Sequence, residues 1–245
     1  MTTLGIIGQG NFGKFVAQQL DGFFKVETYD VGNADMQLAR VAKCDFVALA
    51  IPLGAYHQLL PKLAKVLGRD SVIVDLCSVK IKPLELLAKY LPGKEVLAIH
   101  TLFGPSTTAN GIKGQKIIIC RDTGSFQLHV QAQKFFEHLG LEIIQMDADK
   151  HDQMMAELQA LTYFVAESLA DFGVSEHPIS LPSYGRLVSL LNITNTLSED
   201  VLTTIEQGNP YAQKVRTKLM QSFAKINNKY SANDSSDDTN AGGAE

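Results

Sequence analysis

The sequence predicts an α/β protein in which a doubly wound sheet is followed by a smaller all-helical domain. Short runs rich in Val and Ile alternate with amphipathic stretches from Leu4 to about Met146, which is typical of buried strands joined by crossover helices. A glycine pattern follows the first run. After Asp149 the apolar residues recur every three or four positions, as in helices. This change of period predicts a domain boundary, and 245 residues are enough for two domains.

The first domain is expected to span residues 1–149 and to contain seven strands. Each strand is predicted from a short, mainly apolar run that amphipathic or turn-forming sequence separates from the next. Because the runs are apolar on both faces, helices should cover both sides of the sheet. The expected strands are residues 3–8, 25–30, 45–51, 71–76, 95–100, 115–120 and 141–146.

The second domain, residues 150–230, is expected to be all-helical because its apolar residues keep a helical spacing. Asp149 is expected to cap its first helix and to place His151 in the first turn. Residues 231–245 are rich in Ser, Asn, Asp and Gly with almost nothing apolar to bury, so we expect a disordered tail. The expected helices are residues 150–172, 183–197 and 209–229.

A glycine-rich loop ends the first strand and leads directly into a helix that should run to about Leu20. A GxGxxG pattern in this context predicts a Rossmann-type dinucleotide site. Gly8 allows the tight turn, Gly10 lets the backbone approach a pyrophosphate, and Gly13 lets the helix pack closely on the strand. Free amides at the helix N-terminus favour the phosphates. The expected cofactor-binding residues of the loop are Gly8, Gln9, Gly10, Asn11, Phe12 and Gly13.

An acid at the end of the second strand indicates which dinucleotide is bound. Asp30 follows Gly13 by 17 residues, where a carboxylate can accept hydrogen bonds from the adenosine ribose hydroxyls. Asp30 would repel a 2′-phosphate, and no Arg or Lys follows it directly, so the sequence predicts NAD rather than NADP. Loops at the carboxyl ends of later strands should complete the site through Ile51, Pro52 and Ser78.

Composition and charge argue against several classes of partner. The net charge is −4 and the basic residues are scattered, so a small-molecule ligand is favoured over nucleic acid or an acidic membrane. No apolar run approaches the ~20 residues of a membrane span, and no basic segment precedes the first apolar run, so neither insertion nor export is expected. Three distant cysteines and no cluster of ligating residues predict no disulfide framework and no metal, which fits a reducing cytoplasm.

Two later segments, together with the glycine loop, resemble the prephenate and arogenate dehydrogenases of tyrosine biosynthesis. Residues 74–80 read VDLCSVK and residues 98–105 read AIHTLFGP. The family's motifs are approximately D-x-x-S-V-K and H-P-M-F-G-P, so Thr101 and Leu102 replace Pro and Met. The resemblance extends over about residues 1–230. It includes residues 151–161, which look like the family's interdomain helix, and residues 184–187, which look like its substrate arginine segment.

This resemblance implies an enzyme that oxidises the ring alcohol of prephenate or arogenate with NAD and releases carbon dioxide. His100 would accept the hydroxyl proton, since an unperturbed histidine pKa of about 6.5 suits a general base. Ser78 would hold the imidazole or the substrate hydroxyl, and Arg186 would grip a substrate carboxylate in two parallel bonds. The other expected substrate-binding residues are His151, Thr101 and Tyr163, the last at a position where many family members carry a histidine.

Other functions share this fold and stay open from sequence. Imine and β-hydroxyacid reductases also join a Rossmann domain to helices, and a third hypothesis is a catalytically silent NAD(H) sensor. Retention of Ser78 and His100 argues against the sensor. The resemblance also implies a homodimer formed through the helical domain. Prephenate is mildly favoured over arogenate, because the segment after His100 offers hydroxyls and no carboxylate for an ammonium group.

Overall fold

The computed structural model describes residues 1–194 and 197–234, and its centre is one seven-stranded sheet of order β2-β1-β3-β4-β5-β6-β7. The first five strands are parallel, β6 runs antiparallel to β5, and β7 is parallel to β6. Each predicted strand is present, with its ends displaced by at most two residues. The strands are β1 (Thr3–Ile7), β2 (Lys25–Tyr29), β3 (Phe46–Leu49), β4 (Val72–Asp75), β5 (Val96–Thr101), β6 (Lys116–Cys120) and β7 (Glu142–Met146).

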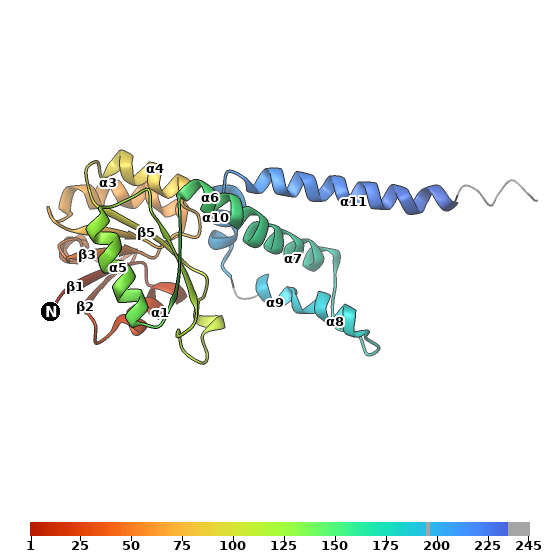
Figure 1. Cartoon of the computed structure of the whole chain (residues 1–245), viewed down its shortest axis with the longest axis horizontal. Helices are drawn as coiled ribbons and strands as arrows, with labels where there is room; N and C mark the ends of the chain where they lie inside the picture. Colours follow the sequence, from red (N-terminus) through yellow and green to blue (C-terminus); the bar gives the residue numbers. More distant parts are fainter. Residues whose placement is uncertain (195–196, 235–245) are drawn as a thin grey trace, which may run out of the picture.

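Helices cover both faces of the sheet, which confirms the doubly wound α/β class (Figure 1). On one face, α1 (Asn11–Leu20) and α5 (Phe126–His138) bury apolar side chains against the strands. On the other face, apolar side chains of α2 (Asp35–Val41), α3 (Tyr56–Val66) and α4 (Ile81–Tyr90) form a second core with the same sheet. Successive strand residues point to opposite faces, so strands that are apolar throughout supply both cores.

The strand order creates a crevice at one edge of the sheet. The chain passes from β1 to β2 on one side and returns to β3 on the other side of β1. Because β1, β3, β4 and β5 are parallel, their carboxyl ends lie at the same edge. In open α/β sheets the ligand binds outside the carboxyl ends at such a reversal. The glycine loop after β1 and the short helix η1 (Leu53–Ala55) after β3 therefore border the expected crevice.

After β7 the described chain is helical. The first expected helix is present and begins slightly earlier, as α6 (Ala148–Met155), the π-helix η3 (Ala156–Ala160) and α7 (Leu161–Phe172). The expected helix over residues 183–197 is interrupted at Leu190 into α8 (Pro182–Ser189) and α9 (Leu191–Thr194). Residues 195–196, which the sequence prediction placed in the same helix, lie outside the described residues.

The sequence prediction missed α10 (Glu199–Gly208), whose buried residues are Thr204, Ile205 and Gly208. The contacts of α10 with η1 explain this helix better than the spacing of its apolar residues does. The amide of Leu53 donates to Thr204 Oγ1 at 3.2 Å, and a Cβ on Gly208 would lie 2.9 Å from the Leu53 side chain. A contact across 151 residues of chain thus docks α10 onto η1.

The last helix, α11 (Ala212–Asp234), continues into the segment that the sequence predicted as a disordered tail. Residues 231–234 are helical, since extending an existing helix adds one hydrogen bond for each residue that is ordered. The rest of the predicted tail, residues 235–245, lies outside the described residues.

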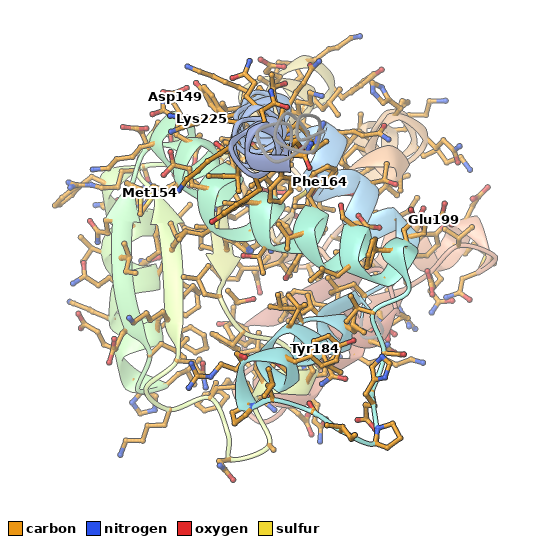
Figure 2. All side chains as sticks on the ribbon, turned by 90° about the vertical axis from the view of Figure 1, so that its right-hand side faces the viewer. Asp149, Met154, Phe164, Tyr184, Glu199 and Lys225 are labelled. Atoms are coloured by element: carbon orange, nitrogen blue, oxygen red, sulfur yellow. The ribbon has the colours of Figure 1, made fainter. Side chains whose placement is uncertain are left out.

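The helical part extends away from the sheet (Figure 1). Figures 1 and 2 both show α7 between α11 on one side and α8 with α9 on the other. The guanidinium carbon of Arg216 on α11 lies 5.9 Å from the ring centroid of Phe164 on α7, which ties these two helices together. None of the helices in the described ranges has the length and apolar character that a membrane crossing requires.

Candidate active site

The glycine loop has the backbone geometry that close approach of a phosphate requires. Gly8 has a φ of 103°, and a Cβ there would lie 2.3 Å from the carbonyl oxygen of Ala50. A Cβ on Gly13 would lie 1.9 Å from the carbonyl oxygen of Gly8, so α1 can pack here only with glycine. By contrast, a Cβ on Gly10 would meet nothing within 4 Å. Since α1 begins without a side-chain cap, its free amides adjoin open space that can hold a pyrophosphate.

The other residues of the loop differ in what they can offer a cofactor. Gln9 Nε2 donates to the carbonyl oxygen of Gly8 at 3.1 Å, so its side chain folds back on the turn. Asn11 is exposed at the start of α1. Phe12 packs on Phe15, with ring centroids 6.1 Å apart, so its side chain belongs to the core. The ring of Phe12 is therefore held by the core, and its backbone lies in the loop.

Asp30 lies directly beside the glycine loop, because the amide of Gly8 donates to the carbonyl oxygen of Tyr29 at 2.9 Å. Asp30 Oδ1 accepts from the amide of Val31 at 2.8 Å, and its other carboxylate oxygen has no partner among the described residues. Ile51 and Pro52 are half-buried after β3, and a Cβ on Gly8 would lie 2.9 Å from the Ile51 side chain. The structure thus gathers the predicted cofactor-binding residues at the reversal in strand order.

His100 lies near the carboxyl end of β5 and points toward the sheet face that α6 covers. It pairs across the sheet with Ile118, and cross-strand partners share a face. Ile118 packs in turn on Met155 of α6. His100 is 5% exposed, and among the described residues its Nε2 has no hydrogen-bond partner. This nitrogen is not completely buried, so it keeps some exposed surface.

A chain of hydrogen bonds runs from the inner side of His100 into α6. His100 Nδ1 lies 2.9 Å from His151 Nε2, and His151 Nδ1 lies 2.8 Å from Asp152 Oδ1. The side chains of His151 and Asp152 have no exposed surface. His151, expected as a substrate contact, is therefore screened from the crevice and contacts His100 instead.

The helix that presents His151 begins two residues earlier than the sequence suggested. Asp147, and not Asp149, is the N-cap of α6, and its Oδ1 accepts from the amide of Lys150 at 2.6 Å. Asp149 lies in the first turn, where it binds Gln153 and the hydroxyl of Tyr211. Both acids favour the helix N-terminus, so spacing alone did not distinguish them.

Burial dominates the protonation of both imidazoles. It lowers the pKa of His100 well below the ordinary histidine value, and charge on His151 and Lys80 lowers that pKa further. Burial also lowers the pKa of His151, although the hydrogen bond that its Nδ1 donates to Asp152 opposes this shift. Both rings are therefore neutral at neutral pH, and a neutral His100 is able to accept a proton.

A buried ion pair fixes the loop between β4 and α4. The Lys80 ammonium pairs with the Asp75 carboxylate, and neither side chain has exposed surface. The hydroxyl of Tyr56 donates to Asp75 Oδ1 at 2.5 Å, and the amide of Cys77 donates to the same oxygen at 3.3 Å. Burial raises the pKa of the Cys77 thiol to about 12, so this group stays protonated. The sequence identified Asp75 and Lys80 only as parts of the family motif and of the loop after β4, and it did not identify Tyr56. No local pattern shows that the three side chains are buried together.

Ser78 and Thr101, two other predicted site residues, form no hydrogen bond with His100 among the described residues. The Ser78 hydroxyl is half-buried and has no hydrogen-bond partner among the described residues, so it is available to a ligand. No hydrogen bond joins it to His100 among the described residues, where His151 binds Nδ1 of the imidazole, so either of its two expected roles stays a prediction. Thr101 donates from its hydroxyl to the carbonyl oxygen of Phe103 at 3.0 Å and stabilises the turn after β5.

Arg186 and Tyr163 belong to the helical part and are not hydrogen-bonded or ion-paired with His100. Arg186 is exposed on α8 and pairs with no carboxylate among the described residues. Figure 1 shows α8 apart from β5, below α7. Tyr163 packs against Ala160, Ile205 and Ala212, which form the small core of the helical part. A single chain therefore assembles the cofactor loop and His100, while Arg186 and Tyr163 lie elsewhere.

Comparison with known proteins places the chain in a family. Residues 23–145 match the model of the family described as prephenate dehydrogenase, nucleotide-binding domain. The chain belongs to this family. The match covers half of the chain, from just before β2 into β7, and the glycine loop lies just before the matched residues.

Members of the family resemble this chain over only part of their length. Arogenate dehydrogenase 2, chloroplastic, from Arabidopsis thaliana is 29% identical over 168 residues, which are 65% of this chain and 46% of that protein. The 4-amino-4-deoxyprephenate dehydrogenase of Streptomyces pristinaespiralis is 24% identical over 197 residues, 77% of this chain and 65% of that protein. The chain thus spans less than two thirds of each of these relatives.

A solved structure confirms the fold. The crystal structure of prephenate dehydrogenase from A. aeolicus in complex with hydroxyphenyl propionate and NAD+ superposes with a TM-score of 0.77 at 19% identity. The superposition covers 96% of this chain and 93% of that one. The Rossmann-type sheet followed by helices is therefore the architecture of this family.

Proposed function

We propose that the chain is an NAD-dependent dehydrogenase of tyrosine biosynthesis. It converts prephenate to 4-hydroxyphenylpyruvate, or arogenate to tyrosine, by oxidative decarboxylation. The observation that carries the proposal is the neutral imidazole of His100 near the carboxyl end of β5. Its Nδ1 is bonded to His151, and its Nε2 has no hydrogen-bond partner among the described residues. Membership of the family supports the substrate class.

The residues of the chain supply positioning and proton transfer. Bound NAD would accept a hydride from the ring carbon that carries the hydroxyl group. The hydroxyl proton passes to Nε2 of His100, and the ring carbon becomes a carbonyl. Loss of the ring carboxylate as carbon dioxide leaves its bonding electrons in the ring, which becomes aromatic, and the former carbonyl oxygen takes up a proton to become the phenol hydroxyl. Ser78 and Thr101 are proposed to orient the substrate beside His100.

The proposal assigns the nucleotide to residues 1–149 and substrate binding and dimer formation to residues 150–230. Gly8 to Gly13 hold the pyrophosphate, Asp30 binds the adenosine ribose, and Ile51, Pro52 and Ser78 border the nicotinamide. Arg186 grips a substrate carboxylate and Tyr163 contributes to the same pocket. We place the enzyme in the cytoplasm, where the buried thiols of Cys44, Cys77 and Cys120 stay reduced.

The direct test mixes the purified protein with NAD and either prephenate or arogenate and follows the absorbance of NADH. We expect turnover, with a higher kcat/KM for prephenate because no acid adjoins His100 in the segment after β5. An advantage of tenfold or more for arogenate, about 1.4 kcal/mol, would contradict that preference. Absence of NADH formation with both acids would overturn the proposed function.

Asp30 should determine the preference for NAD. Asp30→Ser removes the carboxylate that repels a 2′-phosphate, so the ratio of kcat/KM for NAD to that for NADP should fall by tenfold or more. Asp35→Ser is the matched control, because Asp35 lies farther along the same connection in α2. A wild-type protein that prefers NADP would contradict the assignment.

Arg186 should act on substrate affinity more than on turnover. Arg186→Ala removes a contact that ground state and transition state share, so KM for the diacid should rise while kcat changes little. Steady-state kinetics at saturating NAD measure both constants. An unchanged KM would remove Arg186 from the substrate site, and Arg40→Ala, at the ion pair with Glu27 on the sheet, serves as the control.

We further propose that the chain is a homodimer joined through its helical part. One side of α11 carries Met220, Phe223, Ile226 and Tyr230, which are 51–63% exposed and recur at three- and four-residue spacing. Figure 1 shows this helix extending beyond the other helices. An exposed apolar stripe of this length, on the part of α11 that extends beyond the other helices, fits a second copy of the same helix.

The dimer should dissociate when charge is placed on this stripe. Phe223→Glu would bury a carboxylate at the interface, so sedimentation should shift from a mass of two chains to one. Gln221→Glu adds the same charge on the opposite side of α11 and should leave two chains associated. A wild-type protein that sediments as one chain would overturn the dimer.

A further inference from the structure

Asp152 ends the chain of hydrogen bonds that begins at His100, and its other contacts fix the direction of that chain. Asp152 Oδ1 accepts from the amide of Lys80 at 2.8 Å, and Oδ2 accepts from the amide of Ile81 at 2.9 Å. Both amides lie at the N-terminus of α4, where the helix dipole favours negative charge. Held by two N–H donors, Asp152 acts as a carboxylate, which only accepts hydrogen bonds.

The proton between Asp152 and His151 therefore belongs to His151 Nδ1. A neutral imidazole carries one ring proton, so Nε2 of His151 has a lone pair. This lone pair lies 2.9 Å from Nδ1 of His100, and the proton of that contact must come from His100. His100 is then protonated on Nδ1 and keeps its lone pair on Nε2, the nitrogen that keeps some exposed surface.

We propose that His151 and Asp152 are positioning residues that hold His100 in the Nδ1–H tautomer and so direct its basic Nε2 toward the substrate. The inference rests on the proposed function and specifies how its base is prepared. Asp152 also binds α4, and the side-chain Nδ2 of Asn209 donates to the backbone carbonyl oxygen of Asp152 at 2.8 Å. The two amides at the start of α4 fix the carboxylate, and Asn209 fixes the backbone of the same residue, so His151 has one orientation in which both of its nitrogens are bonded.

The charged groups around the two rings keep them neutral. Lys80 is the cation that acts on both, and it opposes a charged imidazole on either residue. Asp75 and Asp152 favour a charged His151, but burial outweighs them and the pKa of His151 stays below its ordinary value. With neutral rings, the direction of the hydrogen bonds is determined by the Asp152 carboxylate.

The tautomer can be measured without cofactor or substrate. Long-range ¹H–¹⁵N correlation spectra of protein labelled at histidine distinguish protonated from bare ring nitrogens, and single substitutions assign the six histidines. We expect His100 and His151 both to be protonated on Nδ1 and bare on Nε2. A wild-type His100 that is protonated on Nε2 would overturn the proposal.

Two substitutions of His151 separate positioning from packing. In His151→Gln the amide NH₂ donates to the carboxylate of Asp152. The amide oxygen is then left to accept from His100 Nδ1–H, so the tautomer of His100 should be retained. His151→Leu fills a similar volume without an acceptor, and His100 should lose its Nδ1–H preference. His138→Gln, at an exposed position at the end of α5, is the control and should leave the His100 signals unchanged. A His100 tautomer that is the same in His151→Leu as in the wild type would contradict the role of His151.

Kinetics provide an independent readout. In a Ser-His-Asp triad a wrong tautomer lowers kcat by about 10⁴, and we expect His151→Leu to lower kcat at least tenfold with KM for NAD unchanged. His151→Gln should recover most of that loss. Equal kcat for the Leu and Gln variants would contradict positioning. If the wild type oxidises neither acid, the proposed function fails, while the spectra still decide the tautomer.

Discussion

His100→Asn should lower kcat by about two to four powers of ten, the usual contribution of general acid–base catalysis. Asparagine can still form hydrogen bonds at this position, but it cannot take up the hydroxyl proton. Binding of NAD, followed by fluorescence titration, should change little because His100 lies on β5 and the glycine loop follows β1. His138→Asn on the surface of α5 is the matched control. Activity within a factor of about three of wild type would exclude a general-base role.

The pH dependence of the wild type should carry the signature of a buried base. Burial, His151 and Lys80 lower the pKa of His100, so this group stays deprotonated to lower pH than an exposed histidine does. The value of kcat/KM should remain level as the pH falls through about 6.5 and decline only well below it. The free energy of unfolding should fall as the pH drops from about 6.5 to the lowered pKa of His100, because in that range only the unfolded chain takes up a proton on this histidine. A rate decline centred at or above the ordinary histidine pKa would contradict this geometry.

Lys80→Met should destabilise the fold by about 3–5 kcal/mol, the range for leaving one partner of a buried ion pair uncompensated. The Asp75 carboxylate would keep the hydroxyl of Tyr56 but lose the ammonium group that pairs with it, and it has no exposed surface. Urea unfolding at neutral pH measures the loss of free energy. The loss follows from charge and not from volume, because methionine retains most of the lysine stem.

The double variant Lys80→Met/Asp75→Asn is the control for this prediction. Asparagine is neutral and its amide oxygen can still accept from the hydroxyl of Tyr56. Removal of both charges should therefore recover most of the lost stability. A loss below about 1 kcal/mol in the single variant would mean that water or another cation reaches Asp75, since a truly buried unpaired charge costs more.

The sequence by itself predicted the sheet and the cofactor loop, because both depend on local patterns. A strand that is apolar throughout needs cover on both faces wherever it lies, and all seven predicted strands are observed. Three glycines within six residues have separate local roles. Gly8 allows a tight turn, Gly10 leaves space for a ligand to approach the backbone, and Gly13 lets α1 pack closely on that turn. The motif around His100 likewise identified the candidate base before its surroundings were known.

Only the tertiary structure decided what surrounds that base. His151 was expected to touch substrate, yet it is buried behind His100, because α6 crosses the sheet face on which His100 lies. Asp152 binds amides 71 and 72 residues away, and α10 is stabilised by a contact 151 residues away. None of these long-range contacts can be predicted from local sequence spacing. Hydrophobic periodicity reports which side of an element is buried, whereas the partner that it meets, and hence which histidine faces the crevice, depends on how the elements pack.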